Sequence, residues 1–131
     1  MNKRIVIIAS IFGILAVVMG AFGAHGLRDR ITPAELEIWK TAVDYHFYHT
    51  LALLFVSRYS KGVSRTINFS FISFIIGIIL FSGSLYLLST RTITGLNWSF
   101  LGPVTPIGGL FMILGWLGLL IATLRTNNVR V

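Results

Sequence analysis

The sequence predicts an all-α membrane protein: a four-helix transmembrane bundle of one domain, residues 1–131, with both termini in the cytoplasm. Three observations support this prediction. Hydrophobic residues make up 55% of the 131 residues and charged residues only 11%, which is outside the usual range for soluble domains. Several long stretches carry no charge, and the lysines and arginines gather at their ends. The net charge of +7 therefore fits membrane topology, with the lipid bilayer as the partner and no nucleic acid.

The first predicted span is 5–27. This stretch has no charged residue and exceeds the ~20 residues needed to cross a bilayer. The alternative is a signal peptide cleaved near Gly23 and Ala24, since Lys3 and Arg4 precede the apolar run. The run is too long and its small-residue site too weak for that alternative. We therefore expect a retained helix.

The second predicted span is 41–57, preceded by an interfacial helix start at 33–40. Thr32 and Glu35 have capping-box spacing, and Pro33 suits the first helical position, so the helix should begin there. The first two turns are amphipathic, which favours the membrane interface. The position of any bend between 33–40 and 41–57 is not predicted.

The third and fourth predicted spans are 67–89 and 106–124. Both lie in charge-free stretches, and two prolines divide the second stretch into a loop and a helix. Thr105 suits the N-cap position and Pro106 the first helical position, because proline lacks an N–H that would go unsatisfied there.

The distribution of lysine and arginine orients the spans. Seven basic residues lie at the termini and in the 58–65 loop, and four lie in the other two connections. By the positive-inside rule the first group faces the cytoplasm. The prediction is a multi-pass protein of the inner (cell) membrane.

Small residues recur on three of the predicted spans and predict close helix packing. Lipid is as apolar as leucine, so helices in a membrane associate through close backbone contact. A pore lining or a hinge is the alternative role for these glycines. The predicted packing positions are Gly13, Gly20, Gly77, Gly108 and Gly115. Aromatic residues near the outer boundary are interpreted as interfacial anchors: Trp39, Tyr86, Trp98 and Phe100.

Polar side chains concentrate toward the outer half of the membrane, and an ionisable residue inside a span indicates a candidate functional site. We predict a polar cluster of His25, Arg28, Asp44, His46, His49, Ser84 and Tyr86. Asp44 either occupies a pocket between the first three spans, with Arg28 or His25 as its partner, or lies at the wet interface. On a helical wheel Asp44 is about 160° from His46 and about 140° from His49, so all three cannot face one ion. Which face points inward is left open.

His46 and His49 are three residues apart, a spacing that can present two imidazoles to a metal ion. Hydrogen bonding of neutral histidines across a helix interface is the simpler interpretation. The sequence contains no catalytic motif and no cysteine, which excludes disulfides and thiol catalysis. No enzyme activity, catalytic residue, metal or cofactor is predicted.

Four segments resemble a known family. They are the run 20–27 with Gly-Ala-Phe-Gly-Ala-His-Gly-Leu, the run 39–49 with its Tyr-His-x-x-His motif, Gly-Ser-Leu-Tyr at 83–86, and the glycine- and proline-rich 102–116. In this order they resemble the domain-of-unknown-function 423 family, which has transmembrane-protein-256-like relatives. The resemblance implies a four-span membrane protein and no activity. It places His25, His46, His49 and Tyr86 in family motifs.

Three functions remain open at this point. The leading hypothesis is a non-enzymatic protein that packs against itself or a membrane-protein partner, because the chain has short loops and small-residue helix faces. The first alternative is a small proton- or ion-coupled transporter or channel that uses the His/Asp cluster. The second is a metal-, haem- or quinone-binding protein.

Overall fold

Helices account for most of the computed structural model, which describes residues 1–59, 65–97 and 99–125. Three segments are long and apolar enough to cross a membrane: Lys3–Leu27, Arg65–Ser89 and Ser99–Arg125. The elements in chain order are α1 (Lys3–Phe22), η1 (Gly23–Leu27), α2 (Pro33–Tyr59), α3 (Arg65–Gly77), η2 (Ile78–Ser82), α4 (Gly83–Ser89), α5 (Arg91–Thr94), η3 (Ser99–Leu101) and α6 (Val104–Arg125).

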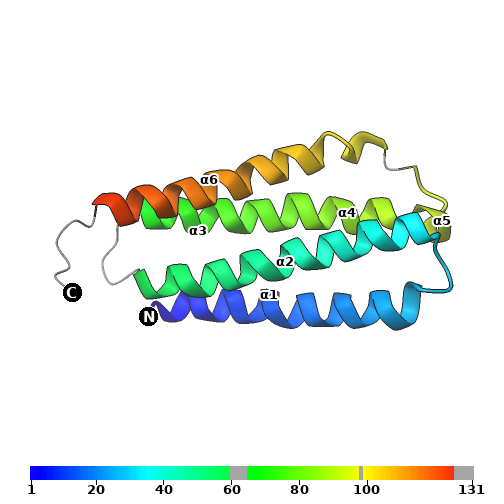
Figure 1. The fold of residues 1–131 in the computed structure, drawn as a ribbon, viewed down its shortest axis with the longest axis horizontal. Coiled ribbons are helices and arrows are strands. Elements are labelled where there is room, and N and C mark those ends of the chain that lie inside the picture. The colour runs from blue at the N-terminus through cyan, green and yellow to red at the C-terminus, as the bar shows by residue number, and fades with distance from the viewer. Residues whose placement is uncertain (60–64, 98, 126–131) are drawn as a thin grey trace.

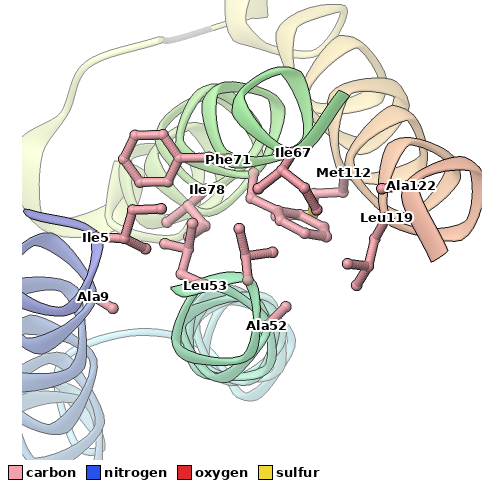
Figure 2. Packing of buried hydrophobic residues seen from close by; sticks show 12 residues of the cluster. Ile5, Ala9, Ala52, Leu53, Ile67, Phe71, Ile78, Met112, Leu119 and Ala122 are labelled. Atoms are coloured by element: carbon pink, nitrogen blue, oxygen red, sulfur yellow. The ribbon is translucent and has the colours of Figure 1, made fainter. Parts of the chain in front are cut away.

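The long helices lie alongside one another and alternate in direction (Figure 1). Helix α1 packs on α2, α3 packs on α6, and α2 packs on the continuous rod formed by α3, η2 and α4. In a view along the helices, α2 and α3 lie between α1 and α6 (Figure 2). The start of α1 and the end of α6 lie at the same end of the molecule (Figure 1).

Helix α1 runs from an Asn2 N-cap, whose side chain accepts hydrogen bonds from the backbone N–H groups of Arg4 and Ile5. With the π-helical turn η1 the helix extends to Leu27. Most of its apolar side chains face outward, and α1 itself buries only Ile5, Ala9 and Ala16. This is the pattern of a helix at the edge of a membrane bundle, where lipid covers the remaining surface.

Helix α2 begins at Pro33, as the capping box predicts. The Thr32 hydroxyl accepts a hydrogen bond from Glu35 N at 3.2 Å, and Glu35 Oε2 accepts one from Thr32 N at 3.0 Å. The helix then continues without a break to Tyr59, a length of ~40 Å. Residues 33–40 therefore form the first turns of the same helix as residues 41–57.

The third helical rod contains a second π-helical turn, η2, between α3 and α4. It lies against α6 at the tightest contact of any described glycine, where a Cβ on Gly108 would be 2.3 Å from Phe81 N. Helix α6 begins at Val104, two residues before the predicted start at Pro106. The Thr105 hydroxyl faces Ser84 Oγ instead of capping the helix.

The glycines on α3 and α6 are at close helix contacts, and those on α1 are less constrained. A Cβ on Gly77 would lie 2.7 Å from Met112 Cγ, and one on Gly115 would lie 2.5 Å from the Phe74 ring. At Gly13 and Gly20 the nearest atoms are side-chain methyl groups at 3.6 and 3.4 Å, which is close to ordinary van der Waals contact.

Two apolar clusters fill the interior. The larger cluster joins all the long helices near the end where α1 begins; Figure 2 shows Ile5 and Ala9 of α1 extending toward Leu53 and Ile78. The smaller cluster, at the opposite end, is Leu27, Ile31 and Trp39. The histidines of α2 lie between the two clusters along the chain.

Candidate functional site

The two histidines of α2 face the interior. His46 and His49 are 5% and 6% exposed, and they share their face with the buried Trp39, Ala42 and Leu53. Asp44 is on the opposite, exposed face. The structure thus answers the question that the helical wheel left open.

His49 is hydrogen-bonded through both ring nitrogens. Its Nδ1 lies 2.7 Å from the Tyr45 carbonyl oxygen, and its Nε2 accepts a hydrogen bond from Trp116 Nε1 at 3.2 Å. Indole N–H only donates, so Nε2 carries no proton, and Nδ1 is the donor to Tyr45. A second proton, on Nε2, would place that N–H group against the N–H group of Trp116. His49 is therefore a neutral imidazole that links α2 to α6.

His46 links α2 to α4 through one nitrogen only. Its Nδ1 lies 3.2 Å from the Tyr86 hydroxyl oxygen. Its Nε2 is buried without a hydrogen-bond partner among the described residues, beside α1, where the Phe12 ring packs edge-on at 5.6 Å. A buried unsatisfied polar atom carries a desolvation cost, so Nε2 of His46 is a point where an additional donor or acceptor would be favourable; the buried hydroxyl of Ser82 is a second such atom among the described residues.

Glu35 is the most fully buried ionisable side chain at the end of the molecule where α2 begins, with 1% exposure. Besides Thr32, it accepts hydrogen bonds from the Thr92 hydroxyl at 2.8 Å and from Arg91 Nε at 3.3 Å. Burial alone would raise the pKa of the Glu35 carboxyl. The hydrogen bonds from Thr32, Thr92 and Arg91 outweigh burial and hold this pKa below its usual value. The carboxylate connects the start of α2 to α5.

Trp39 is buried, in contrast to its predicted role as an interfacial anchor. Its Nε1 donates to the Met19 carbonyl oxygen at 2.9 Å, and its ring packs against Tyr86 with centroids 4.6 Å apart. The ring fits because residue 23 is glycine: a Cβ on Gly23 would lie 2.5 Å from it. Tyr86 also points inward, toward His46, while Phe100 is exposed and Trp98 lies outside the described residues.

The predicted polar cluster is not a single site. His46 and Tyr86 are in contact, and His49 contacts α6 instead. Ser84 is buried and hydrogen-bonds with Thr105 Oγ1 at 2.7 Å. The remaining three members are all exposed, and none of them forms an ion pair among the described residues: His25, Arg28 and Asp44.

The sequence predicts a pocket around Asp44 among the first three spans, and the observed groove lies between α1 and α2 alone. Asp44 and Arg28 line an open groove between α1 and α2, and no residue of the third helical rod contributes to it. The prediction of a pocket among three spans is therefore wrong. The reason is that α2 turns its histidine face, and not its Asp44 face, toward α3 and α4.

The described residues offer no group of three or more histidine, aspartate or glutamate side chains placed to hold a metal ion. The ring nitrogens of His46 and His49 point to different helices. These histidines hold helices together as hydrogen-bond partners. The predicted cluster omitted Trp116, the partner of His49, and Thr105, the partner of Ser84, and it omitted the separate buried contacts of Glu35. The capping box did indicate that Glu35 is structurally important, but the buried contacts with α5 lie 56 and 57 residues away along the chain.

Comparison with known proteins identifies the family. A family model described as a protein of unknown function (DUF423) matches residues 19–109, from the C-terminal end of α1 to the first turns of α6. This chain belongs to that family. The matched region includes Trp39, His46 and His49 of α2, Tyr86 and Gly108.

Curated relatives of the family are named UPF0382 membrane proteins. One from Staphylococcus epidermidis is 41% identical over 123 residues, covering 94% of this chain and 97% of the relative. One from Staphylococcus aureus is 42% identical with the same coverage, and YwdK of Bacillus subtilis is 40% identical over 126 residues, covering 94% of this chain and 98% of YwdK. No solved structure matches the chain. With its relatives and its three apolar helices, this chain is a membrane protein whose environment is the lipid bilayer.

Proposed function

We propose that this chain is a four-span, non-enzymatic protein of the inner membrane that acts by assembling with itself or with another membrane protein. In this proposal α2 is the fourth span, with both termini in the cytoplasm. Support comes from the length of α2 and from its position alongside the other long helices (Figure 1). The shared end at which α1 begins and α6 ends is also consistent with an even number of crossings.

The observation that carries the proposal is that the interior polar groups are used to join helices of the same chain. Both nitrogens of His49 are hydrogen-bonded, Ser84 is bonded to Thr105, and Trp39 is bonded to Met19. Groups of this kind stabilise a bundle and are not arranged around a substrate. The surfaces left for interaction are the outward faces of the edge helices, which expose large apolar residues such as Ile11 on α1 and Leu117 on α6.

Cysteine cross-linking tests assembly directly, because the chain has no cysteine of its own and each introduced thiol is unique. We expect Ile11→Cys or Leu117→Cys to form a disulfide-linked dimer or a cross-link to a partner in native membranes. Leu53→Cys, at a fully buried position, is the matched control and should stay monomeric. A chain that remains monomeric and uncross-linked at both exposed positions contradicts the proposal.

A small proton- or ion-coupled transporter is the second candidate, and the unsatisfied Nε2 of His46 is the observation that favours it. Liposomes loaded with a pH-sensitive dye distinguish the two functions. An assembly protein gives no proton flux above that of protein-free liposomes. Flux that disappears in His46→Gln, with the fold retained, would establish the transport function instead.

A further inference from the structure

A groove of about 470 Å³ lies between α1 and α2 at the end where α1 stops. Its floor is apolar and includes Gly20, Val43 and the edge of the buried Trp39. Charged residues line its rim: Arg28 after η1, and Lys40 and Asp44 on α2. The groove therefore combines an apolar floor with charged side chains at its rim.

A second hollow of about 440 Å³ follows the same seam toward the middle of both helices. It lies beside Gly13, Val17 and Val18 of α1 and Phe47 and Leu51 of α2. Thr50 also lines it, but the Thr50 hydroxyl donates to the His46 carbonyl oxygen at 2.8 Å, so the methyl group faces Gly13. The second hollow is thus apolar along most of its length.

The two hollows follow one another along the seam. One leaflet of a bilayer has an apolar thickness of ~15 Å, which corresponds to about ten residues of helix. A chain that starts beside Arg28 therefore reaches Val18 and Val17, where the second hollow begins. Gly20 keeps the path open, because a larger side chain there would project into the groove beside Val43.

Of the three charged residues at the rim, Lys40 is paired with Glu37 outside the groove at 2.6 Å, both side chains being exposed. This leaves Arg28 and Asp44 as one positive and one negative charge, neither of which forms an ion pair among the described residues, and the two sum to zero. A ligand whose polar end is also neutral overall but carries both signs would complement the pair. An anionic head group would leave Asp44 opposed by a like charge.

We propose that the α1/α2 seam is a binding site for a phospholipid with a zwitterionic head group that carries a primary amine, the class of phosphatidylethanolamine. The phosphate binds Arg28 and the ammonium donates to Asp44, since charge-assisted hydrogen bonds are the strong ones at such a boundary. One acyl chain lies over Gly20 and reaches the start of the second hollow at Val18 and Val17. The site does not depend on assembly, so it stands or falls separately from the proposed function.

Native mass spectrometry of the purified full-length protein tests the site. The probes are phosphatidylethanolamine, phosphatidylglycerol and phosphatidylcholine with the same acyl chains, offered in equal amounts. We expect phosphatidylethanolamine to be retained about tenfold over the other two. Phosphatidylcholine has no N–H to donate to Asp44, and phosphatidylglycerol adds a negative charge. Such a ratio corresponds to ~1.4 kcal/mol.

The variants Arg28→Gln and Asp44→Asn should each lower retention about tenfold, and Asp44→Asn should also remove the preference over phosphatidylcholine. Arg30→Gln and Asp29→Asn are matched controls, because both residues are exposed in the same loop and neither lines the groove. Val17→Trp fills the second hollow from an exposed position and should also lower retention. Circular dichroism and thermal melts confirm that each variant is folded.

Three results overturn the proposal. The first is equal retention of the three lipids or a preference for phosphatidylglycerol. The second is an equal effect of the site variants and their controls. The third is efficient disulfide dimerisation of Val17→Cys in native membranes, which would show that a second copy of the chain covers the seam.

Discussion

At the scale of single residues, the hydrogen-bond partners distinguish two histidines that look alike in sequence. His49 is satisfied at both ring nitrogens, so its tautomer is determined and it stays neutral. His46 uses one nitrogen for Tyr86 and leaves the other buried without a partner among the described residues. The two residues therefore have different roles: His49 joins α2 to α6 through its Nε2, and His46 joins α2 to α4 through its Nδ1.

Trp116→Phe should destabilise the protein by ~1–2 kcal/mol, because it leaves the buried Nε2 of His49 without a donor. The Trp116 side chain is about half exposed, so little buried area is lost with it. A double-mutant cycle with His49→Leu, measured by denaturant titration in mixed micelles, isolates the pair. We expect a coupling free energy of ~1 kcal/mol. Additive effects of the two changes would mean that the contact contributes nothing.

Glu35→Gln should lower the melting temperature, with a loss of ~1–3 kcal/mol. The carboxylate oxygens accept hydrogen bonds from Thr32, Thr92 and Arg91, and an amide would place an NH₂ group against at least one of these donors. Glu37→Gln is the matched control, since Glu37 is exposed and its ion pair with Lys40 is at the surface. Equal melting temperatures for the two variants would contradict the structural role of Glu35.

The lowered pKa of Glu35 also predicts how stability depends on pH. The folded pKa lies below the unfolded one, near 4.5, so the ionised carboxylate stabilises the fold fully above that value. This stabilisation is lost as the pH falls through the folded pKa. Melting temperatures measured from pH 7 down to pH 3 should decrease below about pH 4.5. The decrease should be smaller in Glu35→Gln, and an identical pH profile in the two proteins would refute the assignment.

At the scale of helices, two π-helical turns shape the contacts. The turn η1 brings Gly23 beside Trp39, and η2 brings the backbone of Phe81 beside Gly108. Turns of this type insert an extra residue into a helix and are rare. Gly23, at the start of η1, faces Trp39, and Gly108 faces η2, so neither glycine tolerates a side chain in this packing, whereas Gly83 has open space around it.

Gly108→Ala should destabilise the bundle by ~2–3 kcal/mol, because the new methyl group would overlap the backbone of Phe81, which cannot rotate away. Gly83→Ala, in the rod of α3, η2 and α4 against which Gly108 packs, is the control. Nothing lies within 4 Å of a Cβ on Gly83, and alanine favours a helix over glycine by up to ~1 kcal/mol. Thermal melts of the two variants in detergent should therefore shift in opposite directions. A Gly108→Ala protein as stable as the parent would rule out the close contact.

Leucine substitutions compare the two glycine stripes. Gly115→Leu places a side chain against the Phe74 ring and should unfold the α3/α6 interface. Gly20→Leu should have a smaller effect, because its neighbour is a Val43 methyl group at 3.4 Å and an open groove lies beside it. Resistance to proteolysis in micelles measures the difference, and equal sensitivity of the two variants would contradict it.

At the scale of the whole molecule, α2 and the rod of α3, η2 and α4 form the centre, and α1 and α6 lie at the edges (Figure 2). The central helix α2 carries three of the four acidic residues and two of the three histidines, and it buries Glu35, His46 and His49, which contact neighbouring helices. The edge helix α1 exposes most of its apolar side chains. Such an arrangement suits a protein that keeps its polar groups internal and offers its apolar faces to lipid or to another protein.

Topology is tested with a reporter that is active only in the periplasm. Fused after Val131, it should be silent, because the seven-to-four distribution of basic residues predicts a cytoplasmic C-terminus. Inserted after Asp29, between α1 and α2, it should be active. An active reporter at Val131 together with a silent one at Asp29 would reverse the proposed orientation, and activity at both sites would show that α2 does not cross the membrane.

The sequence by itself determined the helical class, the membrane environment, the family and the start of α2. Each depends on local chemistry: long charge-free runs, a capping box and a set of short motifs. Only the tertiary structure decided which face of α2 is buried, and with it the separation of Asp44 from His46 and His49. That choice depends on contacts such as His49 with Trp116, 67 residues apart, and Glu35 with Thr92, 57 residues apart. The free energy of such contacts comes from surfaces that meet only after the helices pack, so no periodicity within one helix can indicate it.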